Sequence, residues 1–357
     1  MNDVVFLSVT SPNSVGVRKK IENQVNSCER LGVNARWFSF DKGVLIPFFE
    51  IYKSVLSKRF DVLILRHFGA RTIFIVPLLF WLRMRKVEVI LDVPTPYRVI
   101  LQEIRKSNLN IFVRYLKPPL LHILVPIINL PASTVLQYSD ESRWFSVFAS
   151  GKTKPVANGY DFDTMDERPA VPEFSNELRI ICVASIAFWH GYDRLINGLN
   201  EYRRTTKSDI QVKITIAGDG RDKQSLVDLV QKLSLNDAVE FVGNKSGDEL
   251  QKLYNSHHIG VSSLGSFRIN LYRSSTLKNR EYACVGLPFI IATEDPDFPF
   301  DSPFVFQVPQ DESFINIGSV IDFYSNIATD SLSHSIRHDA RQRISYDAKI
   351  RELLNLR

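Results

Sequence analysis

The sequence predicts an α/β protein with two Rossmann-like domains, each built on an open parallel sheet and facing the other across a cleft. Its 357 residues exceed the roughly 100–200 residues of one ordinary domain. Short β-branched apolar runs alternate with amphipathic stretches, which is typical of parallel strands joined by helices. The alternation is interrupted once, at residues 164–178, by a segment with two prolines, four acidic residues and little apolar periodicity.

The N-terminal half contains short apolar runs that predict parallel strands. A helix is expected from about Arg18 to Leu31, because Gly32 is a natural residue at a helix C-terminus. A turn-rich segment, 158–163, closes this half, and we therefore place the first domain at residues 1–163. The expected strands are 4–9, 35–40, 61–66, 87–93, 133–138 and a short one near 155–157.

The C-terminal half repeats the pattern after a linker at 164–178. We place a second domain at 179–335 and expect residues 336–357 to form a helix that crosses back to the first domain. Ligands are expected at the carboxyl ends of the strands and in the cleft between the domains. The expected strands are 179–185, 212–218, 238–243, 259–264 and 287–292, and the helices are about 192–204, 221–234, 247–255 and 275–285.

Composition narrows the classes of function. Three widely spaced cysteines suggest neither a disulfide framework nor a metal site, and no secretory leader opens the sequence. The apolar runs 72–82 and 120–130 are too short to span a membrane. Residues 1–170 hold 23 Lys and Arg against 15 Asp and Glu, whereas residues 171–357 hold 21 against 24. The positive half indicates an anionic partner, with a membrane surface ranked first because no nucleic-acid-binding motif is present.

Two loops have glycines where a ligand or a tight turn needs them. Gly16 lies in the loop after the first strand, where a helix N-terminus could face an anion, although a simple connection is an equal alternative. Gly218 and Gly220 end a strand directly before a helix, without the full dinucleotide-binding pattern. His67, at another strand end, could line the cleft.

The segment 274–290 carries the strongest signal. Ser275 and Thr276 can begin a helix whose first amides would face an anionic group. Glu281 follows one to two turns later, where its carboxylate suits two vicinal hydroxyls such as those of ribose. The alternative is an ordinary capped helix with a surface glutamate.

An ordered series of motifs runs through residues 183–292. A strand, loop and helix at 183–199 precede ITIAGDG at 214–220, VEFVG at 239–243 and the run 281–288. In order and spacing this series resembles the retaining glycosyltransferases of family 4, which have the GT-B fold. DVPTPY, at 92–97, is similar to an element of the bacterial surface-polysaccharide members of that family.

The resemblance implies roles for the residues that match. Glu281 would bind the nucleotide ribose, and the amides of Ser275, Thr276 and Leu277 would hold the donor diphosphate. Gly16 would let its loop approach donor and acceptor. The glycines at 218 and 220 would also belong to the donor site.

The sequence departs from the family pattern at three positions. Arg273 stands where the family has its first glutamate, and Ser185 and His190 stand where it has a basic pair in the donor site. We take Arg273 and Asp92 as the candidate catalytic residues, because Asp92 occupies a position near the reacting sugar in related enzymes. Positive charge for the leaving diphosphate could instead come from Arg268, Arg273, Lys278 and Arg280.

These observations predict a cytoplasmic enzyme that moves a hexose from an NDP-sugar to a saccharide acceptor, with retention of configuration. The acceptor is expected to be lipid-linked, in surface polysaccharide synthesis, and the basic half allows peripheral attachment to the inner face of the membrane. Neither a metal nor a cofactor is expected, and nucleic acid is not expected as a partner. A catalytically inactive relative that binds nucleotide sugar or a partner enzyme is the main alternative, and an NDP-sugar epimerase is a second one.

Overall fold

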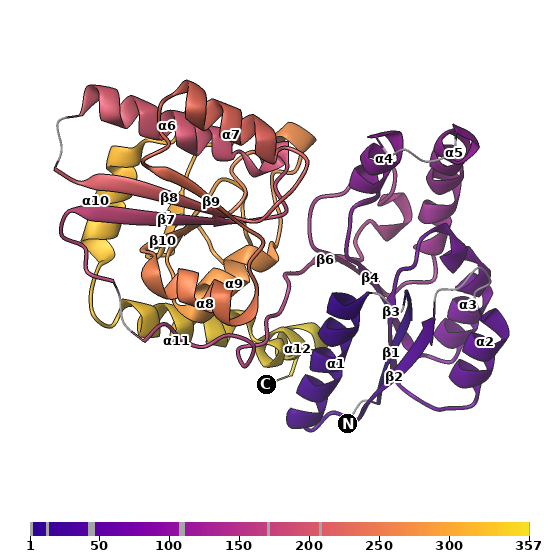
Figure 1. Cartoon of the computed structure of the whole chain (residues 1–357). Coiled ribbons are helices and arrows are strands. Elements are labelled where there is room, and N and C mark those ends of the chain that lie inside the picture. Colours follow the sequence, from indigo (N-terminus) through magenta and orange to yellow (C-terminus); the bar gives the residue numbers. More distant parts are fainter. Residues whose placement is uncertain are drawn as a thin grey trace. The chain divides into compact units, whose positions relative to one another are not determined.

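A computed structural model describes residues 3–11, 14–41, 47–106, 111–169, 172–206 and 209–356. The chain divides into two compact units (Figure 1). The first unit comprises residues 1–159 together with 346–357, and the second comprises residues 160–345. Each unit has its own sheet and its own apolar core.

The first unit is built on a parallel six-stranded sheet in the order β2-β1-β3-β4-β5-β6. This is a doubly wound order: successive strands are added on one side of β1 and then, from β3 onwards, on its other side, so the switch point lies between β1 and β3. Every residue of β1 is buried, as expected for a central parallel strand covered on both faces. The strands are β1 (Val4–Thr10), β2 (Ala35–Asp41), β3 (Val62–Arg66), β4 (Glu88–Val93), β5 (Thr134–Gln137) and β6 (Thr153–Pro155).

Helices cover both faces of the first sheet (Figure 1). The apolar cluster on one face includes residues of α2, α3, α4 and α5, and the cluster on the other face includes residues of α1 and α12. The helices are α1 (Val15–Arg30), α2 (Phe48–Leu56), α3 (Val76–Met84), α4 (Tyr97–Lys106), α5 (Ile111–Ile128) and α12 (Tyr346–Leu354), with 3-10 turns η1 (Ala70–Ile75) and η2 (Val147–Ala149).

Helix α12 completes the first unit although it comes from the end of the chain. Ile350 is buried in the same cluster as β1, and the Asp347 carboxylate accepts hydrogen bonds from Ser27 Oγ at 2.7 Å and Arg30 Nε at 3.2 Å, both on α1. The expected returning segment, 336–357, is therefore divided. Its first part belongs to α11 (Leu332–Ile344) in the second unit, and only α12 lies in the first.

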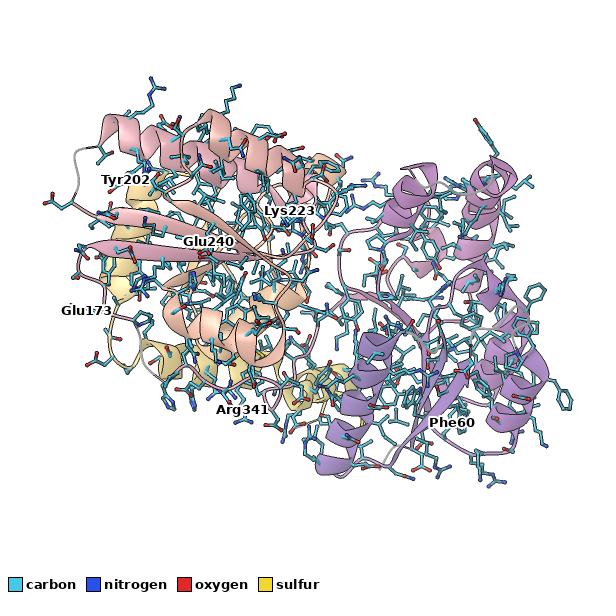
Figure 2. The ribbon with its side chains drawn as sticks, viewed as in Figure 1. Phe60, Glu173, Tyr202, Lys223, Glu240 and Arg341 are labelled. Atoms are coloured by element: carbon cyan, nitrogen blue, oxygen red, sulfur yellow. The ribbon has the colours of Figure 1, made fainter. Side chains whose placement is uncertain are left out.

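The second unit has a parallel six-stranded sheet in the order β12-β11-β10-β7-β8-β9. Its switch point, where strands begin to be added on the other side of the first strand, lies between β7 and β10. Its strands are β7 (Glu177–Val183), β8 (Gln211–Ala217), β9 (Val239–Gly243), β10 (Ile259–Val261), β11 (Phe289–Ile291) and β12 (Val305–Gln307). Its helices are α6 (Tyr192–Thr205), α7 (Lys223–Lys232), α8 (Gly247–Ser256), α9 (Leu277–Val285), α10 (Ile317–Ile327) and α11, with 3-10 turns η3 (Phe188–His190) and η4 (Ser266–Ile269). Figure 2 adds the side chains and labels Lys223 at the start of α7 and Glu240 in β9.

Residues 164–178, expected to form a linker, lie in the second unit. Arg168 is buried, and its guanidinium donates to His257 O at 2.7 Å, Gly286 O at 2.8 Å and Ser333 Oγ at 2.9 Å. A buried guanidinium with three acceptors anchors a segment whose composition resembles a linker.

The two apolar runs considered for membrane insertion belong to helical segments of the first unit. Residues 72–82 lie in η1 and α3, where Leu79 and Leu82 are buried. Residues 120–130 begin in α5, where Leu121 and Val125 are buried. In the part of the chain that the structure describes, every helix is too short or too polar to cross a membrane.

Candidate functional site

The site predicted in the C-terminal half lies at the switch point of the second sheet. Strands β7 and β10 are neighbours there, and the strands that follow each of them lie on opposite sides. Loops at such a point diverge and leave room for a ligand at the carboxyl ends of the strands. Helix α9 lies against the residues that follow β7, because Lys278 Nζ donates to the Tyr192 hydroxyl at 3.4 Å and the His190 ring stacks on Tyr192. Ser185 lies in the loop after β7, and Ser275 and Thr276 directly precede α9.

Gly218 and Gly220 hold the loop after β8 against the loop after β7. A Cβ atom added at Gly218 would overlap Ala184 O, and one at Gly220 would overlap Ile186 O. Ile186 N donates to Asp219 O at 2.7 Å, which fixes the two loops to each other. Gly218 also has φ +136°, a conformation that favours glycine. The two glycines therefore allow the loops after β7 and β8 to pack closely beside the switch point.

His190 does not replace the basic residue that the family pattern has at its position. Its ring is buried, Nδ1 accepts a hydrogen bond from Ala187 N at 3.0 Å, and the ring stacks on Tyr192 at 5.6 Å between centroids. Burial lowers the pKa of His190 to about 3, so the ring is neutral at physiological pH. Ser185 is exposed in the same loop and carries no charge.

Helix α9 begins at Leu277, with Thr276 in the N-cap position. The Thr276 side chain makes no capping hydrogen bond to the helix, and its Oγ1 lies 3.5 Å from Ser262 Oγ at the end of β10. The leading amides of α9 therefore lack this side-chain cap. Ser275 is buried, and Leu277 is exposed. An uncapped helix N-terminus beside two hydroxyls suits an anionic group.

Lys278 and Glu281 lie three residues apart on α9, a spacing that puts them on the same side of the helix. Lys278 Nζ donates to the Tyr192 hydroxyl at 3.4 Å, and burial lowers the pKa of Lys278 to about 7. Glu281 Oε1 accepts a hydrogen bond from the Tyr254 hydroxyl at 2.8 Å. Burial raises the pKa of Glu281, whereas Tyr254 and Lys278 lower it. Tyr192 and Tyr254, distant in sequence, were not predicted as site residues.

Arg280 and Arg268, two of the four cations expected to stabilise the diphosphate, form ion pairs within the protein. Arg280 is fully buried, where its Nη2 donates to Asp295 Oδ1 at 2.7 Å and to Asp297 Oδ2 at 2.6 Å. Arg268 binds Asp193 through two hydrogen bonds, at 2.8 and 2.9 Å, and also pairs with Glu312. The expectation that Arg280 and Arg268 supply charge to a ligand is therefore wrong, because carboxylates already neutralise them.

Lys278 and Arg273 are the other two cations. The backbone of Arg273 forms a bridge with Glu294, while its half-buried guanidinium makes no ion pair or hydrogen bond with any described residue. This side chain is thus available to a ligand. Within the described ranges, no group of three or more His, Cys, Asp and Glu side chains is placed to hold a metal ion.

The two site residues predicted in the first unit, Gly16 and Asp92, belong to the unit built on the other sheet. Gly16 is exposed in the first turn of α1, and a Cβ atom added there would meet nothing within 4 Å. Residues 12 and 13 of the same loop lie outside the described residues. Asp92 is buried at the end of β4, and its Oδ2 accepts a hydrogen bond from Arg66 Nη1 at 3.0 Å. Lys20 is close enough for Asp92 to raise its pKa, although burial dominates and lowers that pKa to about 8.

The fold and the site together define a class of protein. Two parallel six-stranded sheets, each doubly wound and covered by helices, form the GT-B fold of glycosyltransferases. Residues 163–293, which contain the whole switch point of the second sheet, match the family model of glycosyl transferases group 1. By sequence, no curated protein matches the chain. The matched domain and the fold support a hexosyltransferase.

Solved structures of glycosyltransferases are similar over nearly the whole chain. A glycosyltransferase from Rickettsia africae has a TM-score of 0.63 and 14% identity, covering 99% of this chain and 97% of that one. The lipopolysaccharide outer core galactosyltransferase WaaB has a TM-score of 0.62 and 12% identity, covering 99% and 98%. A trehalose-6-phosphate synthase, studied for glycosyl transfer with retention, has a TM-score of 0.58 and 11% identity, covering 99% and 98%. At these identities the similarity shows the fold.

Proposed function

We propose that the protein transfers a hexose from a nucleoside diphosphate sugar to a saccharide acceptor, and that the second unit holds the donor. The observation that carries this proposal is the arrangement of α9, whose uncapped N-terminus, lysine and glutamate lie together inside the segment that matches the glycosyltransferase model. These groups correspond to the diphosphate and the ribose of such a donor.

The diphosphate would lie at the N-terminus of α9. The amides of the first turn and the hydroxyls of Ser275 and Thr276 would donate to it, and Lys278 would neutralise the charge that develops as the sugar leaves. Arg273, whose guanidinium has no ion pair or hydrogen bond with a described residue, would add charge from the preceding segment. This set replaces the basic pair that the neutral His190 and Ser185 do not provide.

Glu281 would bind the ribose through its two oxygens. The Tyr254 hydroxyl occupies Oε1 and so fixes the orientation of the carboxylate, while Oε2 accepts no hydrogen bond from a described residue. An oriented carboxylate with an open oxygen suits a vicinal diol. We propose that no metal or other cofactor takes part.

The acceptor and the stereochemistry are proposed from similar structures and from the surface of helix α5. Similarity to the lipopolysaccharide galactosyltransferase WaaB favours an acceptor of a surface polysaccharide, and similarity to the trehalose-6-phosphate synthase favours retention. Helix α5 carries the exposed apolar residues Tyr115, Leu116, Leu120 and Ile123 beside the exposed Lys117. Apolar and basic side chains together suit the surface of an anionic membrane, where a lipid-linked acceptor would be found.

A thermal-shift screen of UDP-, GDP- and ADP-sugars tests the donor. We expect one class to raise the melting temperature, because a ligand that binds only the folded state stabilises it. Glu281→Gln should weaken the binding of that donor by about tenfold, since the substitution removes a charge-assisted hydrogen bond. Glu249→Gln, at an exposed glutamate on α8, is the matched control and should bind like the parent. No shift with any nucleotide sugar would contradict the proposal.

Turnover separates the enzyme from its alternatives. The active enzyme should hydrolyse the donor slowly or transfer its sugar to acceptor extracts, and Lys278→Met should reduce kcat with less effect on donor affinity. NMR of the product anomer measures retention directly. Tight donor binding without turnover on any acceptor would favour the inactive relative, and interconversion of the donor sugar without transfer would favour an epimerase.

A further inference from the structure

The first unit contains a pocket of about 370 Å³ at the carboxyl end of its own sheet. Its walls come from the residues after β1, after β3 and after β4, and from one side of α5. The pocket therefore lies at the switch point between β1 and β3, which is the place where a doubly wound sheet binds ligands. None of its walls belongs to the proposed donor site.

The two charged side chains that line this pocket are both basic. Arg66 and Lys117 line it, and no aspartate or glutamate does. His67 is also a lining residue, but burial lowers its pKa to about 3, so it contributes no charge at neutral pH. His67 Nδ1 accepts a hydrogen bond from Gly69 N at 3.0 Å, and the Tyr97 hydroxyl lies 2.7 Å from its Nε2. Asp92, directly behind this wall, pairs with Arg66 at 3.0 Å and compensates its charge, so the net positive charge of the pocket comes from Lys117, while Arg66 contributes the N–H donors that Asp92 does not occupy.

Thr10 has a buried hydroxyl oxygen without a hydrogen-bond partner among the described residues. Its side chain is 7% exposed at the end of β1, it lines the pocket, and its Oγ1 makes no hydrogen bond with any described residue. Buried hydroxyls are nearly always hydrogen-bonded, because leaving one unpaired costs free energy. A ligand oxygen that reaches this oxygen at the end of β1 would satisfy it.

Arg66 is oriented towards a ligand by its neighbour in the sheet. Arg66 and Asp92 are paired in register on β3 and β4, and the carboxylate accepts a hydrogen bond from Nη1 at 3.0 Å. A guanidinium has five N–H donors, and this one has no other hydrogen-bond partner among the described residues. Asp92 therefore acts as a positioning residue, which fixes one edge of the guanidinium and leaves the remaining donors for an anion.

The rest of the wall is largely apolar. Val9, Phe68, Ile100 and Leu121 line it, and α5, which supplies Leu121 and Lys117, also carries the exposed apolar residues described above. The pocket thus combines an anion site with an apolar surface.

We propose that this pocket binds a phosphate group carried by the acceptor, with Arg66, Thr10 and Lys117 as the residues that hold it. This inference rests on the proposed glycosyl transfer and names the chemical class of its acceptor, a phosphorylated saccharide. The phosphate could belong to a lipid carrier or to a soluble sugar phosphate, since both present the same oxygens.

The test measures binding to the full chain by calorimetry, with inorganic phosphate, glucose 6-phosphate and dioctanoyl phosphatidic acid below its micelle concentration. Glucose and dioctanoylglycerol are the uncharged counterparts. We expect at least one phosphate compound to bind and its counterpart to bind much more weakly. Binding of glucose 6-phosphate would identify a soluble sugar phosphate, and selective binding of the phosphatidic acid would identify a lipid carrier.

Two variants locate the binding in the pocket. Thr10→Val keeps the side-chain shape and should weaken phosphate binding by about tenfold without lowering the stability of the free protein, because the hydroxyl makes no hydrogen bond with any described residue. Lys117→Gln, at an exposed position, should weaken it by about threefold at low salt and less at high salt. Lys53→Gln, at an exposed lysine of α2 outside the pocket, is the control and should have no effect.

The inference is overturned if no phosphate compound binds, if the uncharged counterparts bind equally, or if Thr10→Val and Lys117→Gln bind like the control. Lys278→Met, in the second unit, removes a contribution from the proposed donor site and should leave the effects of the first-unit variants intact. Donor binding, measured on the same samples with nucleotide sugars, reports separately on the proposed function. A chain that binds donor but shows none of these phosphate effects would retain the glycosyltransferase proposal and lose this one.

Discussion

The two units are built on the same kind of sheet but use their switch points differently. In the first unit the switch point holds a pocket lined by Arg66, which pairs with Asp92 on the adjacent strand, and by Thr10, whose hydroxyl has no hydrogen-bond partner among the described residues. In the second unit the loops pack on each other through glycines, and Arg280 is neutralised inside the fold by two aspartates. The fold thus fixes where a ligand can bind, while the loop residues decide which charges remain available to it.

The largest effect is expected from Arg280→Met. It would leave Asp295 and Asp297 buried without their cation and should lower the free energy of unfolding of the second unit by about 3–5 kcal/mol. Hydrogen exchange with denaturant would assign the loss to the second unit. Arg273→Met, which breaks no ion pair among the described residues, is the control and should change stability little. Equal stability of the two variants would show that Arg280 is not a structural cation.

The glycines offer a second contrast between the units. Gly218→Ala forces a Cβ atom against Ala184 O and should lower the free energy of unfolding by about 1–3 kcal/mol. It should also weaken donor binding. Gly16→Ala has open space and a helical position, so stability should stay the same or rise by up to about 1 kcal/mol. Denaturant unfolding measures both. Loss of transfer in a stable Gly16→Ala protein would indicate that this glycine admits a substrate, as the family resemblance implies.

Buried neutral histidines should make both units sensitive to acid. Burial lowers the pKa of His67 and of His190 to about 3, from an ordinary value of 6.5. Between those values the unfolded chain binds a proton that the folded chain does not, so stability falls as the pH drops from about 6.5 towards 3. Each histidine should account for about 1–2 kcal/mol between pH 6.5 and 5. Melting of His67→Gln and His190→Gln across this range should show a shallower pH dependence; a parallel curve would contradict the assignment.

The smallest signal should be proton uptake on ligand binding, and it should differ between the units. Burial lowers the pKa of Lys278 to about 7, so a diphosphate bound beside it at pH 8 should draw up to about one proton from the buffer. Arginine stays charged throughout this range, so phosphate bound by Arg66 should draw none through that residue. Calorimetry in buffers of different ionisation enthalpy measures the difference. Lys278→Met should abolish the uptake on donor binding, and persistence of the uptake would assign it elsewhere.

Most of the sheet pattern could be predicted from sequence because buried parallel strands are continuous apolar runs. Strands β1, β4, β7 and β8 fall where that rule places them. Strand β12 was missed, because it has three residues, two of them half-buried, and lies at the edge of the sheet. The segment around Arg168 was taken for a linker, because the partners of its guanidinium lie 89 to 165 residues away.

For the donor site, the sequence predicts which kinds of residue take part but not which of them contact each other. The start of α9 and the placement of Glu281 follow from local spacing, since a cap, a helix and a glycine after it are neighbours in sequence. The pairs that tune the site, Tyr254 with Glu281 and Tyr192 with Lys278, join residues 27 and 86 positions apart. The ion pairing of Arg280 likewise depends on the loop with Asp295 and Asp297, which only folding brings next to it.

The position of α12 has a consequence for synthesis on the ribosome. Its Ile350 fills the apolar cluster that contains Val4 and Phe6, and a Cβ atom at Gly159 would press on the Tyr346 ring. One face of the N-terminal sheet therefore stays only partly covered, by α1 alone, until residues 346–354 have emerged, whereas residues 160–345 can finish folding earlier. In nascent chains stalled before α12, the first unit should consequently remain bound by chaperones although it is synthesised first. This is the reverse of the usual order, in which the N-terminal domain folds first.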